Sequence, residues 1–250
     1  MSQTVSLILN EDVEHGGKEY DEDDIENDFA YRNNVLNATK QIRLAFIRKV
    51  YGLLSMQILL TFIIASICLF TPPIKSFVHT NDWMMMFSFI ASIALLVPLH
   101  IKRKESPTNF ILLIAFTVVQ AYTIGVIVTF YSKVVVLQAL VLTLVVLVAL
   151  TAFTFQTKRD FSATHSALFA GLCILIVGGF MQIFIQSSIL ELGIGLGGAF
   201  LFCLFIVVDT QMIMKTLSPE EYILATINLY MDIINLFVYI LRILQELNRQ

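Results

Sequence analysis

The sequence predicts an all-α integral membrane protein with about seven transmembrane helices. Hydrophobic residues make up 57% of its 250 residues and charged residues 14%, whereas a soluble domain has about 45–50% apolar and about 25% charged residues. The apolar residues gather in segments of about 20 residues, which is the length that a helix needs to cross the hydrocarbon core of a bilayer. Most Lys and Arg residues lie at the ends of these segments, as is typical of residues that flank a membrane.

Residues 1–40 precede the apolar segments as a polar, acidic tail, and residues 41–250 form the multi-pass domain. Acidic residues are dense between Glu11 and Asp28. Because few apolar side chains are available to offset the entropy of ordering the tail, we expect it to be disordered. It also lacks a basic stretch followed by an apolar run, so we expect no cleaved signal peptide.

Charged and turn residues set the limits of each segment. The predicted spans are residues 50–70, 83–101, 109–130, 134–155, 166–186, 192–214 and 223–244. Two basic residues precede the first span, and Pro72 and Pro73 end it because proline does not continue a helix. Trp83 begins the second span as an interface residue. Only residues 131–133 separate the third span from the fourth, so these two are expected to be antiparallel neighbours.

The last three spans follow a polar loop at 156–165. Four glycines open the sixth span, namely Gly193, Gly195, Gly197 and Gly198. No strand precedes them, so we interpret them as a surface for close helix packing rather than as a nucleotide loop. The seventh span is unusually polar, and it either crosses the membrane or folds back within it as a re-entrant segment.

Positive charges predict the orientation of the chain. One side of the membrane would hold ten of them, at Lys40, Arg43, Arg48, Lys49, Lys102, Arg103, Lys104, Lys158, Arg159 and Lys215. The other side would hold four, at Lys75, Lys133, Arg242 and Arg249. Because cytosolic loops carry the excess of Lys and Arg, we expect a cytosolic N-terminus. The C-terminus is luminal if the seventh segment spans, and cytosolic if it is re-entrant.

Two carboxylates, Asp209 and Asp232, lie inside the sixth and seventh spans. An acid in the hydrocarbon region costs at least a few kcal/mol and usually faces the bundle interior or a water-filled path. At about 1.5 Å per residue, Asp209 lies roughly 7–8 Å and Asp232 about 13–14 Å from the cytosolic ends of their spans. The loop between the spans is short, so the two residues are expected to lie close together at similar depth.

A polar stripe runs along the seventh span. Asn228, Asp232, Asn235 and Tyr239 are spaced i, i+4, i+7 and i+11, which places them on one face of a helix. Lipid cannot satisfy such side chains, so this face is expected to look inward as a supporting polar face for Asp232.

Paired carboxylates suggest an ion site. Two close carboxylates in a medium of low dielectric cannot both ionise easily, so Asp209 and Asp232 are expected to share a proton and to titrate together. Deprotonated, they offer the hard oxygen ligands that suit Ca²⁺. The pair is therefore a candidate pH sensor on an ion pathway that binds Ca²⁺ transiently. The alternative is a structural hydrogen bond or ion pair between two helices.

Charged residues near the cytosolic ends of the spans add a candidate latch and a candidate mouth. Lys102 and Arg103, after the second span, would pair with Asp209 and hold a path closed, unless they are ordinary membrane anchors. Glu220 and Glu221 would concentrate cations at a cytosolic mouth. Residues 218–221 also read as the N-cap and first turn of the seventh helix.

Five segments carry a resemblance to a known family. Residues 205–211 (FIVVDTQ), 217–222 (LSPEEY) and 228–237 (NLYMDIINLF) resemble the signature of the Bax inhibitor motif family. Residues 42–51 (IRLAFIRKVY) and 128–131 (VTFY) resemble its lifeguard branch. The resemblance covers roughly residues 25–250.

The resemblance implies a fold of seven helices, six of them around a central polar seventh. It implies a Ca²⁺ leak channel of internal membranes, the Golgi membrane first and the endoplasmic reticulum as the alternative, which lowers luminal Ca²⁺ and inhibits apoptosis. It further implies that Asp209 and Asp232 form a pH-sensing latch, with a basic partner near Lys102 or Arg103.

The leading hypothesis is thus a pH-regulated Ca²⁺ leak channel, with Ca²⁺ and H⁺ as its ions and no other cofactor. The alternative is a non-conducting membrane interaction protein, which restrains cell-death factors through its acidic tail. Besides the lipid bilayer and Ca²⁺, cell-death regulators or Ca²⁺-release channels are the expected partners, and nucleic acid is not. We expect no enzyme activity. In particular, the Gly-x-Gly-Asp context of intramembrane aspartyl proteases is absent around both aspartates.

Overall fold

The computed structural model describes residues 40–81, 83–157, 159, 161 and 164–249. The tail predicted to be disordered, residues 1–40, therefore lies outside the described residues except for its last position. Within the described ranges the chain forms eight helices and no strand. The helices are α3 (Lys40–Phe70), α4 (Pro72–Thr80), α5 (Trp83–Ile101), α6 (Thr108–Val128), α7 (Lys133–Gln156), α8 (His165–Ile185), α9 (Ser188–Lys215) and α10 (Tyr222–Arg249).

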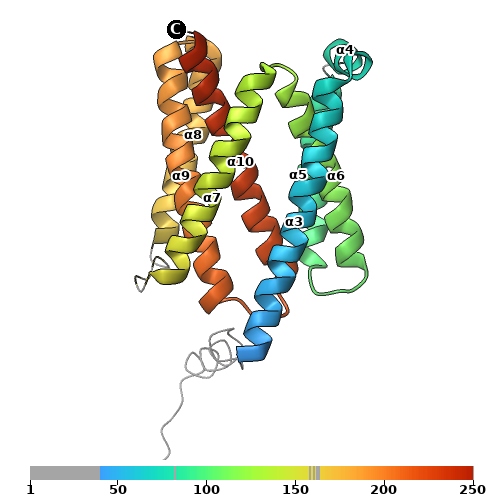
Figure 1. The fold of residues 1–250 in the computed structure, drawn as a ribbon, viewed down its shortest axis with the longest axis vertical. Helices are drawn as coiled ribbons and strands as arrows, with labels where there is room; N and C mark the ends of the chain where they lie inside the picture. Colours follow the sequence, from blue (N-terminus) through green and yellow to red (C-terminus); the bar gives the residue numbers. More distant parts are fainter. Residues whose placement is uncertain (1–39, 82, 158, 160, 162–163, 250) are drawn as a thin grey trace, which may run out of the picture.

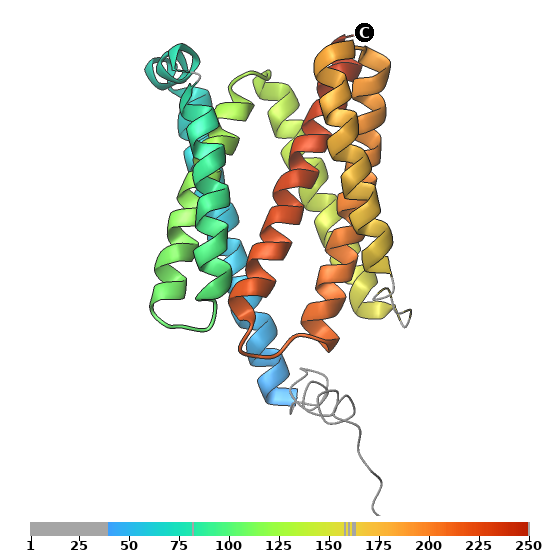
Figure 2. The same cartoon turned by 180° about the vertical axis from the view of Figure 1, so that it is seen from behind.

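Seven of these described helices, all except α4, are long and apolar enough to cross a membrane. The prediction of an all-α multi-pass membrane protein is therefore confirmed. The helices alternate in direction along the bundle, as Figures 1 and 2 show. We call the end that holds the connections after α5, α7 and α9 the basic end, and the end where the chain terminates the C-terminal end.

Helix α4 has no counterpart in the sequence prediction. It has nine residues and lies at the C-terminal end of the bundle, outside the long helices. Pro72 and Pro73 do end α3, but they also begin α4. Proline is tolerated there because the N–H groups in the first turn of a helix form no hydrogen bonds within the helix. His79 Nε2 lies 2.8 Å from Thr129 Oγ1 after α6, which ties α4 to the bundle.

The last helix, α10, runs from the basic end to the C-terminal end (Figure 2). The seventh segment is thus one continuous helix that does not turn back within the bundle, which favours the crossing alternative. The end of the chain lies at the opposite end of the bundle from the start of α3.

Helix α10 is also the centre of the bundle. In its most apolar stretch 61% of the residues are buried, against 11% in α8. It packs against α9, α7, α3 and α6, while α5 packs mainly on α6 and α8 on α9. The central position explains why the most polar helix is the most buried one: the other helices shield its polar groups from lipid.

Candidate functional site

Asp209 and Asp232 are positioned by the close packing of α9 on α10. A Cβ at Gly198 would overlap the ring of Tyr239, and one at Gly195 would lie 3.0 Å from Cγ1 of Ile243. These two glycines therefore let the helices approach, as the sequence suggested for the glycine cluster. A Cβ at Gly193 would meet nothing within 4 Å, so that glycine has no such role.

The structure brings the two aspartates together. Their carboxyl groups lie near enough to act on each other electrostatically. Asp232 is only 7% exposed and Asp209 is half-buried. Because an ionised carboxylate can only accept hydrogen bonds, a bond between the two carboxyls requires that one of them holds a proton. The arrangement thus suits a pair that shares one proton.

One carboxyl oxygen of Asp232 has no hydrogen-bond partner within the described ranges of the chain. Its Oδ2 atom is buried and has no hydrogen-bond partner among the described residues. Two more buried hydroxyls have no hydrogen-bond partner among the described residues, namely those of Tyr51 on α3 and of Thr210, the residue after Asp209 on α9. Buried polar atoms without partners are the usual sites of internal water. The free Oδ2 atom of Asp232 is therefore a place where an internal water would find a partner.

His165, the first residue of α8, is a neighbour that sequence reasoning missed. Its ring is near enough to act electrostatically on the Asp209 carboxyl. In the sequence it stands 44 positions away from Asp209, at the end of a polar loop, and belongs to no ligand motif. Only the packing of α8 on α9 places it there, and no pattern in the sequence specifies which face of α8 meets α9.

The other residues of the predicted polar face have separate contacts. Asn228 lines a cavity between α10 and α5. The Asn235 amide donates to the carbonyl of Met231 in its own helix, at 2.8 Å. Tyr239 stacks on Phe202 of α9, with the ring centroids 5.7 Å apart. This face of α10 therefore meets two other helices, α5 and α9, and Asn235 is satisfied within α10 itself.

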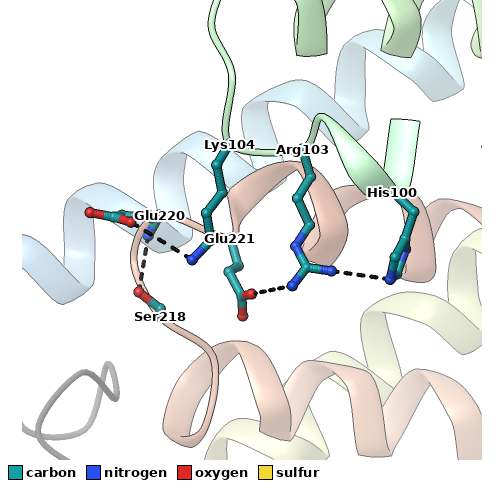
Figure 3. A network of polar contacts seen from close by, with 6 residues as sticks. All are labelled: His100, Arg103, Lys104, Ser218, Glu220 and Glu221. Atoms are coloured by element: carbon teal, nitrogen blue, oxygen red, sulfur yellow. Dashed lines mark hydrogen bonds and ion pairs between the residues drawn. The ribbon is translucent and has the colours of Figure 1, made fainter. Parts of the chain in front are cut away.

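Arg103 pairs with Glu221 in this structure, whereas the latch predicted from the sequence would pair it with Asp209. The Arg103 Nη2 atom lies 3.0 Å from Glu221 Oε1, and its Nη1 atom lies 3.0 Å from His100 Nε2 (Figure 3). Arg103 belongs to the connection after α5, at the very end of the bundle. Asp209 lies six residues before the end of α9, about 9 Å further in, whereas Glu221 directly precedes α10.

The other charged residues at this end also form ion pairs. Lys104 lies 3.9 Å from Glu220, and Lys102 lies 2.6 Å from Glu105 in its own connection. Both glutamates of the predicted mouth therefore face basic side chains. They precede α10, which begins at Tyr222, and do not form its first turn.

Further contacts join three elements around the Arg103–Glu221 pair. The Asn109 amide donates to the Arg103 carbonyl at 3.0 Å and to the Tyr222 hydroxyl at 3.2 Å. The Lys49 ammonium of α3 lies 3.3 Å from the centroid of the Tyr222 ring. We call these five residues the basic-end lock, because they tie α3, the connection after α5, the start of α6 and the start of α10 together.

The described residues contain no group of three or more His, Cys, Asp and Glu side chains placed to hold a metal ion. Ca²⁺ takes 6–8 oxygen ligands, and Asp209 with Asp232 supplies only some of them. Water or further oxygen atoms of the chain would have to supply the rest. The ligand set therefore fits a passing ion better than a resident one.

The chain is similar to proteins of one family over almost all of its length. The family described as Inhibitor of apoptosis-promoting Bax1 matches residues 43–249. Protein lifeguard 4 of Mus musculus is 43% identical over 231 residues, which cover 92% of this chain and 97% of the relative. The Golgi anti-apoptotic protein of vaccinia virus (strain Lister) is 43% identical over 226 residues, covering 90% and 95%. Bax inhibitor 1 of Schizosaccharomyces pombe is 37% identical over 231 residues, covering 90% and 87%.

Proposed function

Because the chain belongs to the family of inhibitors of apoptosis-promoting Bax1, we propose that it is a pH-regulated Ca²⁺ leak channel of an internal membrane, which lowers luminal Ca²⁺ and so inhibits apoptosis. The observation that carries the proposal is the contact between the Asp209 and Asp232 carboxyls inside the helical bundle. We place the channel in the Golgi membrane, since a relative of 43% identity is named for the Golgi, with the endoplasmic reticulum as the alternative.

The proposed regulation follows from competition for the same oxygen atoms. A proton shared by the two carboxyls joins α9 to α10 and occupies the oxygens that a cation would need. When that proton leaves, the two carboxylates repel each other and become ligands for Ca²⁺. Ca²⁺ flux should therefore rise with pH as the pair loses its proton, and fall as it is protonated.

The basic-end lock fits the same proposal. The Arg103–Glu221 pair lies at the end of the bundle toward which, in this proposal, an ion would leave the aspartate pair. By the excess of positive charge this end would be cytosolic. The lock is then a second barrier in series with the aspartate pair, and its charges make it sensitive to the ions that arrive there.

The first experiment measures Ca²⁺ flux into liposomes that contain the purified chain, at a series of pH values. Wild-type protein is expected to conduct, with a steep dependence on pH. Asp209→Asn and Asp232→Asn are each expected to lose that dependence, because neither leaves two titrating carboxyls. Glu191→Gln, which changes an acid in the first turn of α9, is the matched control and should keep it. Folded wild-type protein that passes no Ca²⁺ at any pH would rule out the channel.

A second function, a non-conducting membrane protein that restrains cell-death factors, is favoured by the names of the relatives. These names state an effect on apoptosis and do not mention transport. Here the acidic residues 1–39 would bind cell-death regulators or Ca²⁺-release channels. Deleting these residues separates the two functions. A channel should keep its flux in liposomes, whereas an interaction protein should lose its protective effect in cells while D209N and D232N keep it.

A further inference from the structure

A groove opens on the side of the bundle between α3 and α7. Both helices pack on α10 but hardly on each other, and α10 is visible between them in Figure 1. The space encloses a cavity of about 130 Å³, with α10 as its floor and α6 as one wall. Phe62 and Leu137 on its two rims are 49% and 62% exposed, so the groove opens sideways toward the bilayer.

The groove has the length of one leaflet. Its lining runs along α3 from Ile58 to Phe70 and along α7 from Lys133 to Leu144. At about 1.5 Å per residue these stretches are roughly 17–18 Å long. The hydrocarbon core of a bilayer is about 30 Å thick. A groove of this length reaches from the membrane surface at the C-terminal end to about the middle of the bilayer.

The lining is apolar, and its buried hydroxyls already have partners. Thr61 donates to the carbonyl of Gln57 and pairs with the Tyr230 hydroxyl, each at 2.8 Å. Thr143 donates to the carbonyl of Ala139 at 2.7 Å. Apart from the Ser66 hydroxyl, a polar ligand would find no partner between the helices and would have to give up its hydration. The part of a ligand that fits between the helices is therefore hydrocarbon.

The side chain of Lys133 places a positive charge at the surface end of the groove. Lys133, the first residue of α7, is exposed, and its ammonium lies 4.8 Å from the centroid of the ring of Phe70, the last residue of α3. No carboxylate among the residues that the structure describes forms an ion pair with it. The mouth of the groove thus offers positive charge to an anion at the depth of the lipid headgroups.

We propose that this groove binds a glycerophospholipid of the leaflet at the C-terminal end. One acyl chain lies between α3 and α7, and the phosphate pairs with Lys133. A bilayer lipid reaches the groove sideways without leaving the membrane. Its anionic phosphate lies at the surface end of its acyl chain, just as Lys133 lies at the surface end of the apolar lining. The second acyl chain stays in the bilayer beside the exposed rim. The lipid site does not depend on the channel proposed above, since it uses neither aspartate.

Native mass spectrometry of the full chain in detergent, titrated with phosphatidylglycerol, tests the site. Wild-type protein is expected to retain one lipid more tightly than the others. Lys133→Gln should weaken that lipid about five- to tenfold, through loss of one charge-assisted contact. Ser66→Phe should remove it, because Ser66 lines the groove and a phenyl ring would occupy the space of the chain. Lys133 is exposed, so its replacement leaves the fold intact.

Two matched controls lie away from the groove. Lys75→Gln removes a cation from α4 at the same end of the bundle, and Ala94→Phe adds a ring to an exposed position of α5. Both should bind the lipid as wild type does. Equal affinity in wild type, K133Q and S66F would overturn the proposal. Displacement of the lipid by an equal concentration of oleate would overturn it as well, because the occupant would then be a fatty acid.

Discussion

The Asp232 side chain shows how much a single buried acid depends on its neighbour. Its Oδ2 atom lacks a partner among the described residues, while its other contact is with Asp209. An unpaired polar group in the interior loses its hydration without compensation. The fate of either aspartate is therefore tied to the other, and substitutions that keep a hydrogen bond should differ sharply from substitutions that remove it.

We expect Asp232→Ala to destabilise the protein by about 1–3 kcal/mol, the cost of leaving Asp209 without its partner. Asp232→Asn should cost much less, because its amide can donate to Asp209. Thermal unfolding in detergent of the two variants, beside the double variant with Asp209→Asn, gives the coupling between the sites. Equal melting temperatures for D232A and D232N would show that the two side chains do not support each other.

Gly198 offers a second test with a matched control in the same cluster. Gly198→Ala places a methyl group against the ring of Tyr239, and overpacking of this kind costs about 1–3 kcal/mol. Gly193→Ala, where the methyl group meets nothing within 4 Å, should be neutral. The melting temperatures of the two variants test this prediction. A G198A variant as stable as wild type would mean that the Tyr239 ring moves aside without loss of stability.

At the scale of elements, periodicity and charge predict the helices well and predict contacts between connections poorly. The seven apolar segments predict the spans because the thickness of the membrane fixes the length of a crossing helix. The approach of Asp209 to Asp232 can also be predicted from the sequence, since two helices joined by a short loop pack side by side. The pairing of Arg103 with Glu221 cannot be predicted in this way, because both residues lie in connections whose paths depend on how separate helix pairs pack. Helix α4 was missed because its prolines read as a stop.

Breaking the basic-end lock should raise the Ca²⁺ leak. Arg103→Gln leaves Glu221 without its cation and frees the connection after α5 from the start of α10. We expect liposome flux at neutral pH to increase several-fold, and the exchanged pair Arg103→Glu with Glu221→Arg to restore the low leak. Lys102→Gln is the control, because Lys102 pairs with Glu105 inside its own connection. A rise in K102Q as large as in R103Q would assign the effect to lost surface charge.

At the scale of the whole molecule, the alternation of seven crossing helices fixes where the two ends of the chain lie. Helix α3 starts at the basic end and α10 finishes at the C-terminal end (Figures 1 and 2). The direction of the last helix could not be predicted from the sequence, because a polar stripe suits a central crossing helix as well as a re-entrant one. The packing of α3, α6, α7 and α9 on α10, from one end of the bundle to the other, favours the crossing helix.

Tags at the two ends should therefore lie on opposite sides of the membrane. In sealed vesicles with the cytosolic face outward, protease is expected to remove an N-terminal tag at once. A C-terminal tag should be cleaved only after detergent opens the vesicles. Cleavage of both tags in intact vesicles would contradict the crossing of α10 and would return the last segment to a re-entrant path.

The central place of α10 has a consequence for biogenesis. The ribosome makes this helix last, yet α3, α6, α7 and α9 all pack on it. Until it leaves the translocon, α3 can already pack on α6 and α7 on α9, but the faces of these four helices that meet α10 have no partner. The bundle can close only when the final 28 residues arrive. A chain that stops short of them would reach the membrane and yet never assemble, which makes its last helix a checkpoint for a complete protein.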